Sequence, residues 1–120
     1  EAITSAEPIT GSTRMKSGTA QKMICNMITT GTMIKLGRVY SNLMIDVQMT
    51  NEKLIKRGRS IVMEATGVTE DEAQSAIDKF GTVKKALFAI LAGLDNPEEV
   101  DNKLNKAKGN IRDALKKEGK

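Results

Sequence analysis

The sequence predicts a mostly helical protein. Apolar residues recur at i, i+3, i+4 and i+7 in several segments, which is the spacing of one face of an α-helix. In the second half, helix start signals and single glycines alternate at short intervals, as is typical of short capped helices. One short apolar run, at residues 43–47, is compatible with a strand. The 120 residues are enough for one domain with a sizeable core.

The first helix is expected over residues 19–36, after a loop at residues 1–18. The loop is rich in Gly, Ser, Thr and Pro, which favour turns. Ser17 and Thr19 are candidate N-caps and Gly37 is a candidate stop. Its apolar face consists of Ala20, Met23, Ile24, Met27, Ile28, Gly31 and Ile34. Further apolar residues flank this face, so we expect the helix to be covered on more than one side and its methionines to be core residues.

The middle of the chain is less clear. Residues 43–47 are compatible with a strand or a helix, because periodicity does not decide for so short a run. A clearer helix is expected to begin at Asn51 and to end at Gly67, with Leu54, Ile55 and Ile61 among the residues on its apolar face.

Four further helices are expected after Gly67. Thr69 and Glu72 form the S/T-x-x-E pattern of a capping box, and Gly81 ends that helix. The next helix follows at once and ends at Gly93. Asn96-Pro97 is the next start signal, with proline at the first helical position. A last short helix is expected near the C-terminus, after Gly109, and contains Ala114 and Leu115.

Composition excludes several classes of function. The chain has no histidine and one cysteine, Cys25, so one copy holds no Ser-His-Asp triad, no zinc cluster and no internal disulfide. We expect no metal and no cofactor. The net charge is +4, but the basic residues are spread along the chain and only 2% of residues are aromatic, which argues against nucleic-acid binding. No apolar run is long enough for a membrane span, and the lone cysteine fits a cytoplasmic location.

The most informative segment is the loop that leads into the first helix. Ser12, Thr13, Arg14 and Lys16 supply hydroxyls and positive charge beside a helix N-terminus, which favours binding of a phosphate or another anion. The spacing is not that of a P-loop. The alternative is purely structural: the hydroxyls cap the helix and Arg14 pairs with Glu7.

The same segment carries a resemblance to a known family. The run GSTRMKSGTAQKM at residues 11–23 resembles the signature of the N-acetylmuramic acid 6-phosphate etherases and of the related glucokinase regulatory proteins, in the sugar isomerase (SIS) superfamily. Similarity continues through residues 26–31, 36–40, 42–48 and 51–54 and covers nearly the whole chain. One departure is that Ser5 and Ala6 precede Glu7, where the family has Gly-Pro.

The resemblance implies a fold. Residues 1–50 would be the C-terminal edge of an α/β SIS phosphosugar-binding domain, with at most one of its strands. Residues 51–120 would form a helical C-terminal module, in which residues 64–95 resemble a ubiquitin-associated fold.

The resemblance also implies an activity. Such etherases cleave the D-lactyl ether of N-acetylmuramic acid 6-phosphate with carboxylates as acid and base, in recycling of cell-wall sugars. The family's catalytic glutamates precede this motif, so we expect no catalytic residue in this chain and no activity from it alone.

Partners follow from the same resemblance, and two other functions stay open. The expected partners are a phosphosugar, in the complete protein, and a second copy in a homodimer. The alternatives are a non-enzymatic sugar-phosphate-sensing regulator of the same superfamily and a helical dimerisation module.

Overall fold

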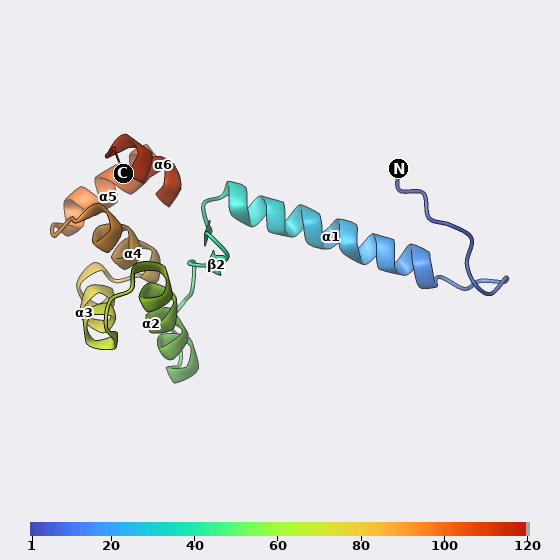
Figure 1. The fold of residues 1–120 in the computed structure, drawn as a ribbon, viewed down its shortest axis with the longest axis horizontal. Helices are drawn as coiled ribbons and strands as arrows, with labels where there is room; N and C mark the ends of the chain where they lie inside the picture. Colours follow the sequence, from blue (N-terminus) through green and yellow to red (C-terminus); the bar gives the residue numbers. More distant parts are fainter. Residues whose placement is uncertain (120) are drawn as a thin grey trace. The chain divides into compact units, whose positions relative to one another are not determined.

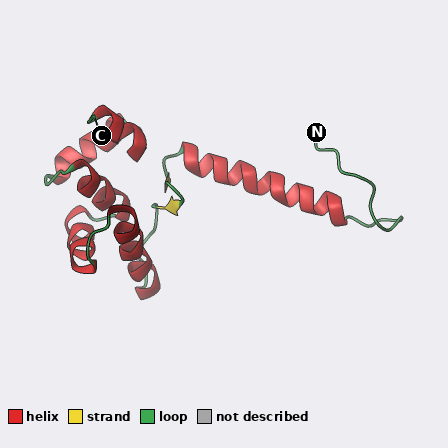
Figure 2. Cartoon of the chain, in the orientation of Figure 1, coloured by secondary structure: helices red, strands yellow, loops and turns green. Residues whose placement is uncertain are grey.

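The computed structural model describes residues 1–119 and is mostly helical over that range, as predicted (Figures 1 and 2). Its elements are α1 (Met15–Lys35), β1 (Val39–Tyr40), β2 (Leu43–Met44), α2 (Glu52–Thr66), α3 (Glu70–Phe80), α4 (Val83–Ala92), α5 (Pro97–Lys106) and α6 (Ile111–Lys117). Within the described residues, no helix is both long and apolar enough to cross a membrane.

The chain divides into two compact units, at residues 1–33 and from Ile34 onward. Residues 34–50 therefore group with the helices that follow them. The assignment of residues 1–50 to a phosphosugar-binding domain stays a prediction, because the first unit holds only a loop and most of one helix.

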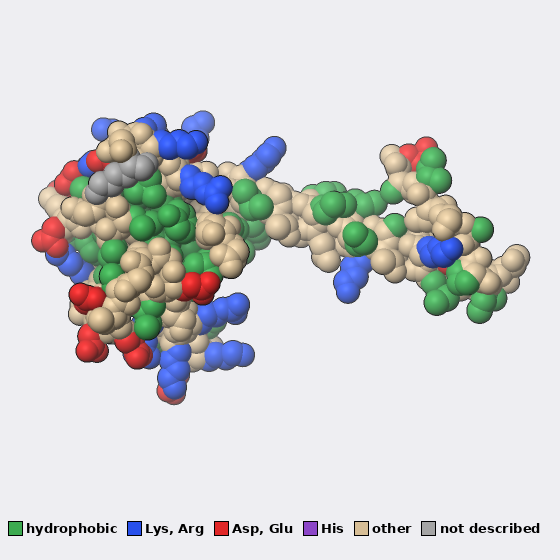
Figure 3. All heavy atoms as spheres, viewed as in Figure 1, with side chains coloured by type: hydrophobic (Ala, Val, Ile, Leu, Met, Phe, Trp, Pro, Cys, Tyr) green, Lys and Arg blue, Asp and Glu red, His purple; other side chains and the backbone are tan. Residues whose placement is uncertain are grey.

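The first unit consists of the loop at residues 1–14 and most of α1. No residue of α1 is buried, and Met27 and Ile28 are 62% and 64% exposed. Hydrophobic side chains are visible along its surface (Figure 3). The helix has the apolar surface that the sequence indicates, but nothing within this unit covers it.

The second unit is built around α4. This helix contacts α2, α3, α5 and α6. Leu87 and Phe88 at its centre are both fully buried. Burial of such large side chains contributes about 1.5–3 kcal/mol each. An uninterrupted apolar run, residues 86–92, suits a helix that has neighbours on several sides.

The helix boundaries of this unit follow the capping signals in the sequence. The capping box of α3 is present: the Thr69 amide donates to the Glu72 carboxylate at 2.8 Å, and Glu72 N–H donates to the Thr69 hydroxyl at 3.4 Å. Four other helices also begin after a side-chain N-cap, which is Asn51, Thr82, Asn96 or Asn110. Gly67, Gly81 and Gly93 end their helices in the left-handed conformation, as predicted.

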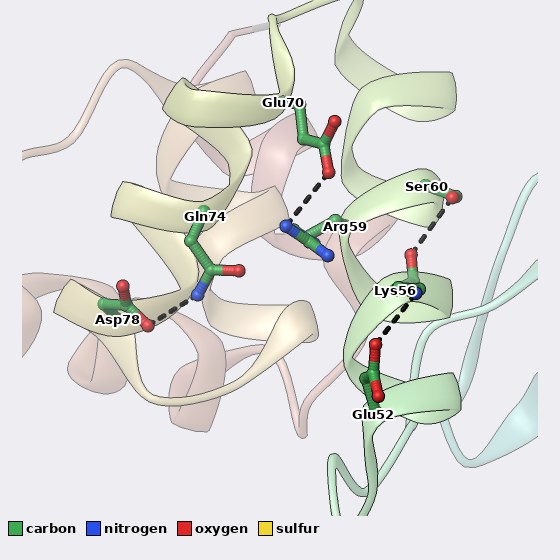
Figure 4. Close-up of polar contacts among 7 residues, drawn as sticks. All are labelled: Glu52, Lys56, Arg59, Ser60, Glu70, Gln74 and Asp78. Atoms are coloured by element: carbon green, nitrogen blue, oxygen red, sulfur yellow. Dashed lines mark hydrogen bonds and ion pairs between the residues drawn. The ribbon is translucent and has the colours of Figure 1, made fainter.

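Polar contacts flank the packed faces of α2 and α3 (Figure 4). Arg59 on α2 forms an ion pair with Glu70 on α3 at 2.9 Å, although its Nε is buried without a hydrogen-bond partner. On α3, Gln74 donates to Asp78 at 2.7 Å. An exposed contact such as that of Gln74 with Asp78 contributes little, so apolar burial is the main source of stability.

The ambiguous run at residues 43–47 contains a strand. Val39 pairs with Met44 and Tyr40 with Leu43, in an antiparallel hairpin whose turn residue Ser41 has a φ of 53°. Next to the hairpin, Ile45 is only 1% exposed and belongs to the helical core. The hairpin therefore lies on the helical unit as part of its structure.

Gly37 brings the start of this segment against the turn between α5 and α6. It is buried and has a φ of 64°. A Cβ at this position would lie 2.6 Å from the Gly109 carbonyl oxygen and 2.9 Å from the Asn110 Cα. Because both contacts are with backbone atoms, no side-chain movement would relieve them.

We predict that Gly37→Ala destabilises this unit more than Gly67→Ala does. Gly67 also has a positive φ, of 76°, but a Cβ there meets nothing within 4 Å. Gly67→Ala should cost about 1–2 kcal/mol from backbone strain alone, and Gly37→Ala should cost about 1–3 kcal/mol more from overpacking. Urea unfolding of the two variants measures the difference. Equal losses would show that the approach of Gly37 to the turn is loose.

Candidate anion-binding site at the start of helix α1

The N-terminus of α1 is capped by a carboxylate from the preceding loop. The amide of Met15 donates to Glu7 Oε2, that of Ser17 donates to Oε1, and that of Lys16 donates to both, all at 3.1 Å. Three otherwise unpaired N–H groups of the first turn are thus satisfied by one side chain. A negative charge at this position also suits the helix dipole.

This arrangement corrects two expectations from the sequence. Ser17 and Thr19 do not cap the helix: α1 begins earlier, at Met15, and the Thr19 hydroxyl donates to the Met15 carbonyl at 3.0 Å. Arg14 does not pair with Glu7, and no ion pair of Arg14 is found among residues 1–119. The carboxylate replaces a hydroxyl cap because it accepts from three amides at once and carries a full charge.

The four residues predicted to bind an anion have different surroundings. Lys16 Nζ donates to Ser5 Oγ at 2.9 Å and to the Ala6 carbonyl at 2.7 Å, so it holds the loop. Thr13 Oγ1 donates to the Gly11 carbonyl at 3.5 Å.

Ser12 lies in the bend with a φ of 60°, which is uncommon for a residue with a side chain. Within the described residues, no hydrogen bond joins Ser12, Thr13, Arg14 and Lys16 to one another. The four residues lie close together in sequence, but they do not form a preorganised binding site.

The electrostatics favour a permanent negative charge on Glu7. Hydrogen bonds from the backbone of Ser17 and Lys16 lower the pKa of Glu7 below its usual 4.5, against a smaller opposing effect of desolvation. An incoming anion would have to displace this carboxylate from the amides. Arg14 and the two hydroxyls are the groups left available to it.

The site holds one carboxylate, which is engaged as a cap, so it offers no acid–base pair for proton transfer. No group of three metal-ligating side chains occurs in residues 1–119. Recognition of an anion by this turn therefore stays a prediction from the sequence.

Comparison with known proteins places the chain in a family. Residues 41–103, just over half of the chain, match the family described as the C-terminal lid domain of glucokinase regulatory protein. The chain belongs to this family. The lid-domain match begins in the hairpin turn and extends through α2, α3, α4 and most of α5.

Curated relatives extend the similarity over nearly the whole chain, as the resemblance in the sequence predicted. An N-acetylmuramic acid 6-phosphate etherase of Clostridium beijerinckii is 54% identical over 94% of this chain and 37% of its own length. The etherase of Clostridioides difficile is 51% identical over 95% of this chain and 38% of its own length. The N-acetylmuramic acid 6-phosphate etherase 1 of Vibrio cholerae is 50% identical over 97% of this chain and 39% of its own length. The chain thus spans less than two fifths of the length of these relatives.

Sequence reasoning missed the role of Glu7. A capping residue is normally adjacent to the helix that it caps, so a glutamate separated from the helix by a turn gives no local signal. The indirect signal was the absence of an acidic residue in the first turn of α1, which left its amides without an obvious acceptor.

We predict that the amide protons of Met15, Lys16 and Ser17 titrate together with Glu7. Because the pKa of Glu7 is lowered in the folded chain, its contribution to α1 is present above pH 4.5 and is lost as the pH falls through the folded value. NMR should therefore show a shared midpoint below 4.5, which disappears in Glu7→Gln. A midpoint at or above 4.5 would contradict the cap.

Proposed function

We propose that this chain is the C-terminal part of a lyase that cleaves the D-lactyl ether of N-acetylmuramic acid 6-phosphate. The main support is the identity of 50–54% to three proteins named as that etherase, over 94–97% of this chain. The reaction eliminates lactate by breaking a carbon–oxygen bond and then adds water. Its acid and base are carboxylates outside this chain, and the enzyme works in the cytoplasm.

Within that enzyme, each unit has a proposed task. Residues 1–50 form the C-terminal edge of the phosphosugar-binding domain, where Ser12, Thr13, Arg14 and Lys16 contact the sugar phosphate. The guanidinium of Arg14, which has no ion pair among residues 1–119, supports this, because planar N–H groups match phosphate oxygens. Residues 51–120 form the helical lid, with an architecture like a ubiquitin-associated fold at residues 64–95. The mutual packing of α2, α3 and α4 supports that likeness.

We predict that Arg14→Gln, in the full-length enzyme, raises KM for the phosphosugar about tenfold or more, as expected for loss of a charge-assisted hydrogen bond. The value of kcat should change little, because the phosphate is remote from the ether bond and is held equally before and during the reaction. Lactate release from N-acetylmuramic acid 6-phosphate is the measurement.

Lys22→Gln is the matched control for this experiment. Lys22 is an exposed cation of α1 whose side chain has no hydrogen bond or ion pair among residues 1–119. Its removal should leave KM unchanged. If both variants behave like the parent enzyme, Arg14 does not contact the phosphate. If the parent releases no lactate, the proposed activity itself is wrong.

A second candidate function is sensing of a sugar phosphate without turnover. The observation that favours it is the match of residues 41–103 to a lid domain of a regulatory protein. Calorimetry separates the two: a sensor binds N-acetylmuramic acid 6-phosphate and releases no lactate. The etherases match 94–97% of this chain, whereas the lid-domain family matches only residues 41–103, and this difference favours the enzyme.

We also propose that α1 packs against a second copy of the chain. Its support is the large apolar surface of α1: Met15, Met23, Met27 and Ile28 are each more than half exposed (Figure 3). Contiguous apolar surface of this kind marks an interaction site in soluble proteins.

We predict that the chain sediments as a dimer and that Met27→Glu shifts it to the monomer, because a buried, unpaired carboxylate is costly. Asn26→Glu adds the same charge at the adjacent, exposed position of α1 and should leave the dimer intact. A parent chain that stays monomeric at high concentration, or equal behaviour of the two variants, would exclude this interface.

A further inference from the structure

Lys84 lies in a cavity of the lid domain that the proposed function does not use. The cavity has a volume of about 520 Å³. Its walls come from residues 45–49, from the beginning of α4, from α5 and from Gly109. Lys84 is the second residue of α4 and is half-buried.

The amine of Lys84 rests on the backbone of the α5–α6 turn. A Cβ built on Gly109 would lie 3.0 Å from Lys84 Nζ, so the missing side chain of Gly109 makes room for it. Within residues 1–119, Lys84 Nζ has no hydrogen bond or ion pair. It is therefore a partly desolvated amine without a direct partner.

The charged groups that face Lys84 are already paired with one another. Asp46 forms an ion pair with Arg38 at 3.0 Å, and Asp101 forms one with Lys85 at 2.7 Å. Desolvation is the largest influence on Lys84 and lowers its pKa, Asp46 opposes this, and Arg38 adds to the lowering. By contrast, hydrogen bonds donated by the Lys103 amine to Glu118 and Glu99 raise the pKa of Lys103.

We propose that Lys84 is a nucleophilic lysine that accepts an acyl group from a small acyl phosphate. A desolvated lysine is the usual form of an activated amine nucleophile. The neutral amine attacks the acyl carbon, the C–N bond forms and the C–O bond to phosphate breaks. The proton that leaves the nitrogen ends on the departing phosphate, so an amide and hydrogen phosphate are the products.

An acyl phosphate fits this cavity better than a neutral acyl donor does. Lys85 lines the same cavity, and the charge of Arg38 acts on Lys84 electrostatically, which favours a dianionic leaving group. Asp46 and Asp101 also line the cavity, and each is ion-paired, with Arg38 and with Lys85, so they oppose the phosphate less than unpaired carboxylates would. The cavity is large enough for a small donor such as acetyl phosphate.

The test is the acetylation rate of each lysine when the folded chain is incubated with acetyl phosphate at neutral pH. Mass spectrometry of peptides gives the initial rates. Lys84 should be acetylated several-fold faster than Lys53, which is exposed and has no ion pair in residues 1–119. In guanidinium chloride, which unfolds the chain, this preference should be lost. An equal or slower rate at Lys84 in the folded chain would overturn the proposal.

Two substitutions test the electrostatic basis, with expected effects of opposite sign. Asp46→Asn removes the charge that keeps Lys84 protonated and should speed its acetylation. Arg38→Gln removes a charge that disfavours the protonated form and should slow it. Lys84→Arg should abolish the modified peptide. Circular dichroism checks that each variant folds. An independent readout is the dependence of the Lys84 acetylation rate on pH in the unsubstituted chain. We expect this profile to lie at lower pH in the folded chain than in the unfolded chain. Equal effects of the two substitutions, or an unshifted profile, would overturn the proposal.

Discussion

Burial of α4 is the constraint on which the lid domain depends. Leu87 and Phe88 are fully enclosed, and four other helices contact the helix that carries them. Each of those helices is short, and short helices are marginal in water unless an apolar face is packed. The boundaries of α2, α3, α5 and α6 are therefore set by local caps, but their stability comes from α4.

Local signals in the sequence predicted much of this fold. Thr69 and Glu72 predict the start of α3, and Asn96-Pro97 predicts the start of α5. Both could be predicted because each cap lies within a few residues of the amides that it satisfies. The sequence did not decide between strand and helix at residues 43–47. The strand there depends on pairing across a turn with residues 39 and 40, and hydrophobic periodicity carries no information about such pairing. Glu7 was missed for the same reason: its partners in α1 are a whole loop away.

The two units use charge in different ways. In the lid domain, carboxylates and cations are largely matched, as in Arg59 with Glu70, or Lys103 with Glu99 and Glu118. Lys84 is an exception, because it has no ion pair among residues 1–119. The carboxylates that line its cavity, Asp46 and Asp101, are paired with Arg38 and Lys85. At the start of α1, the positive end of a helix is matched by Glu7, and Arg14 is left available. The sequence predicted the cations of this turn but not the carboxylate that competes for its amides.

The close approach of Gly37 to the α5–α6 turn has a consequence for how the chain can be divided. Ile45 fills part of the same core as α4, and Gly37 anchors the segment that carries it. A chain shortened to begin at Asn51 would lose both, and the core would be left with an open hole lined by apolar side chains. A shortened chain meant to keep this core closed should therefore begin near Gly37 rather than at Asn51.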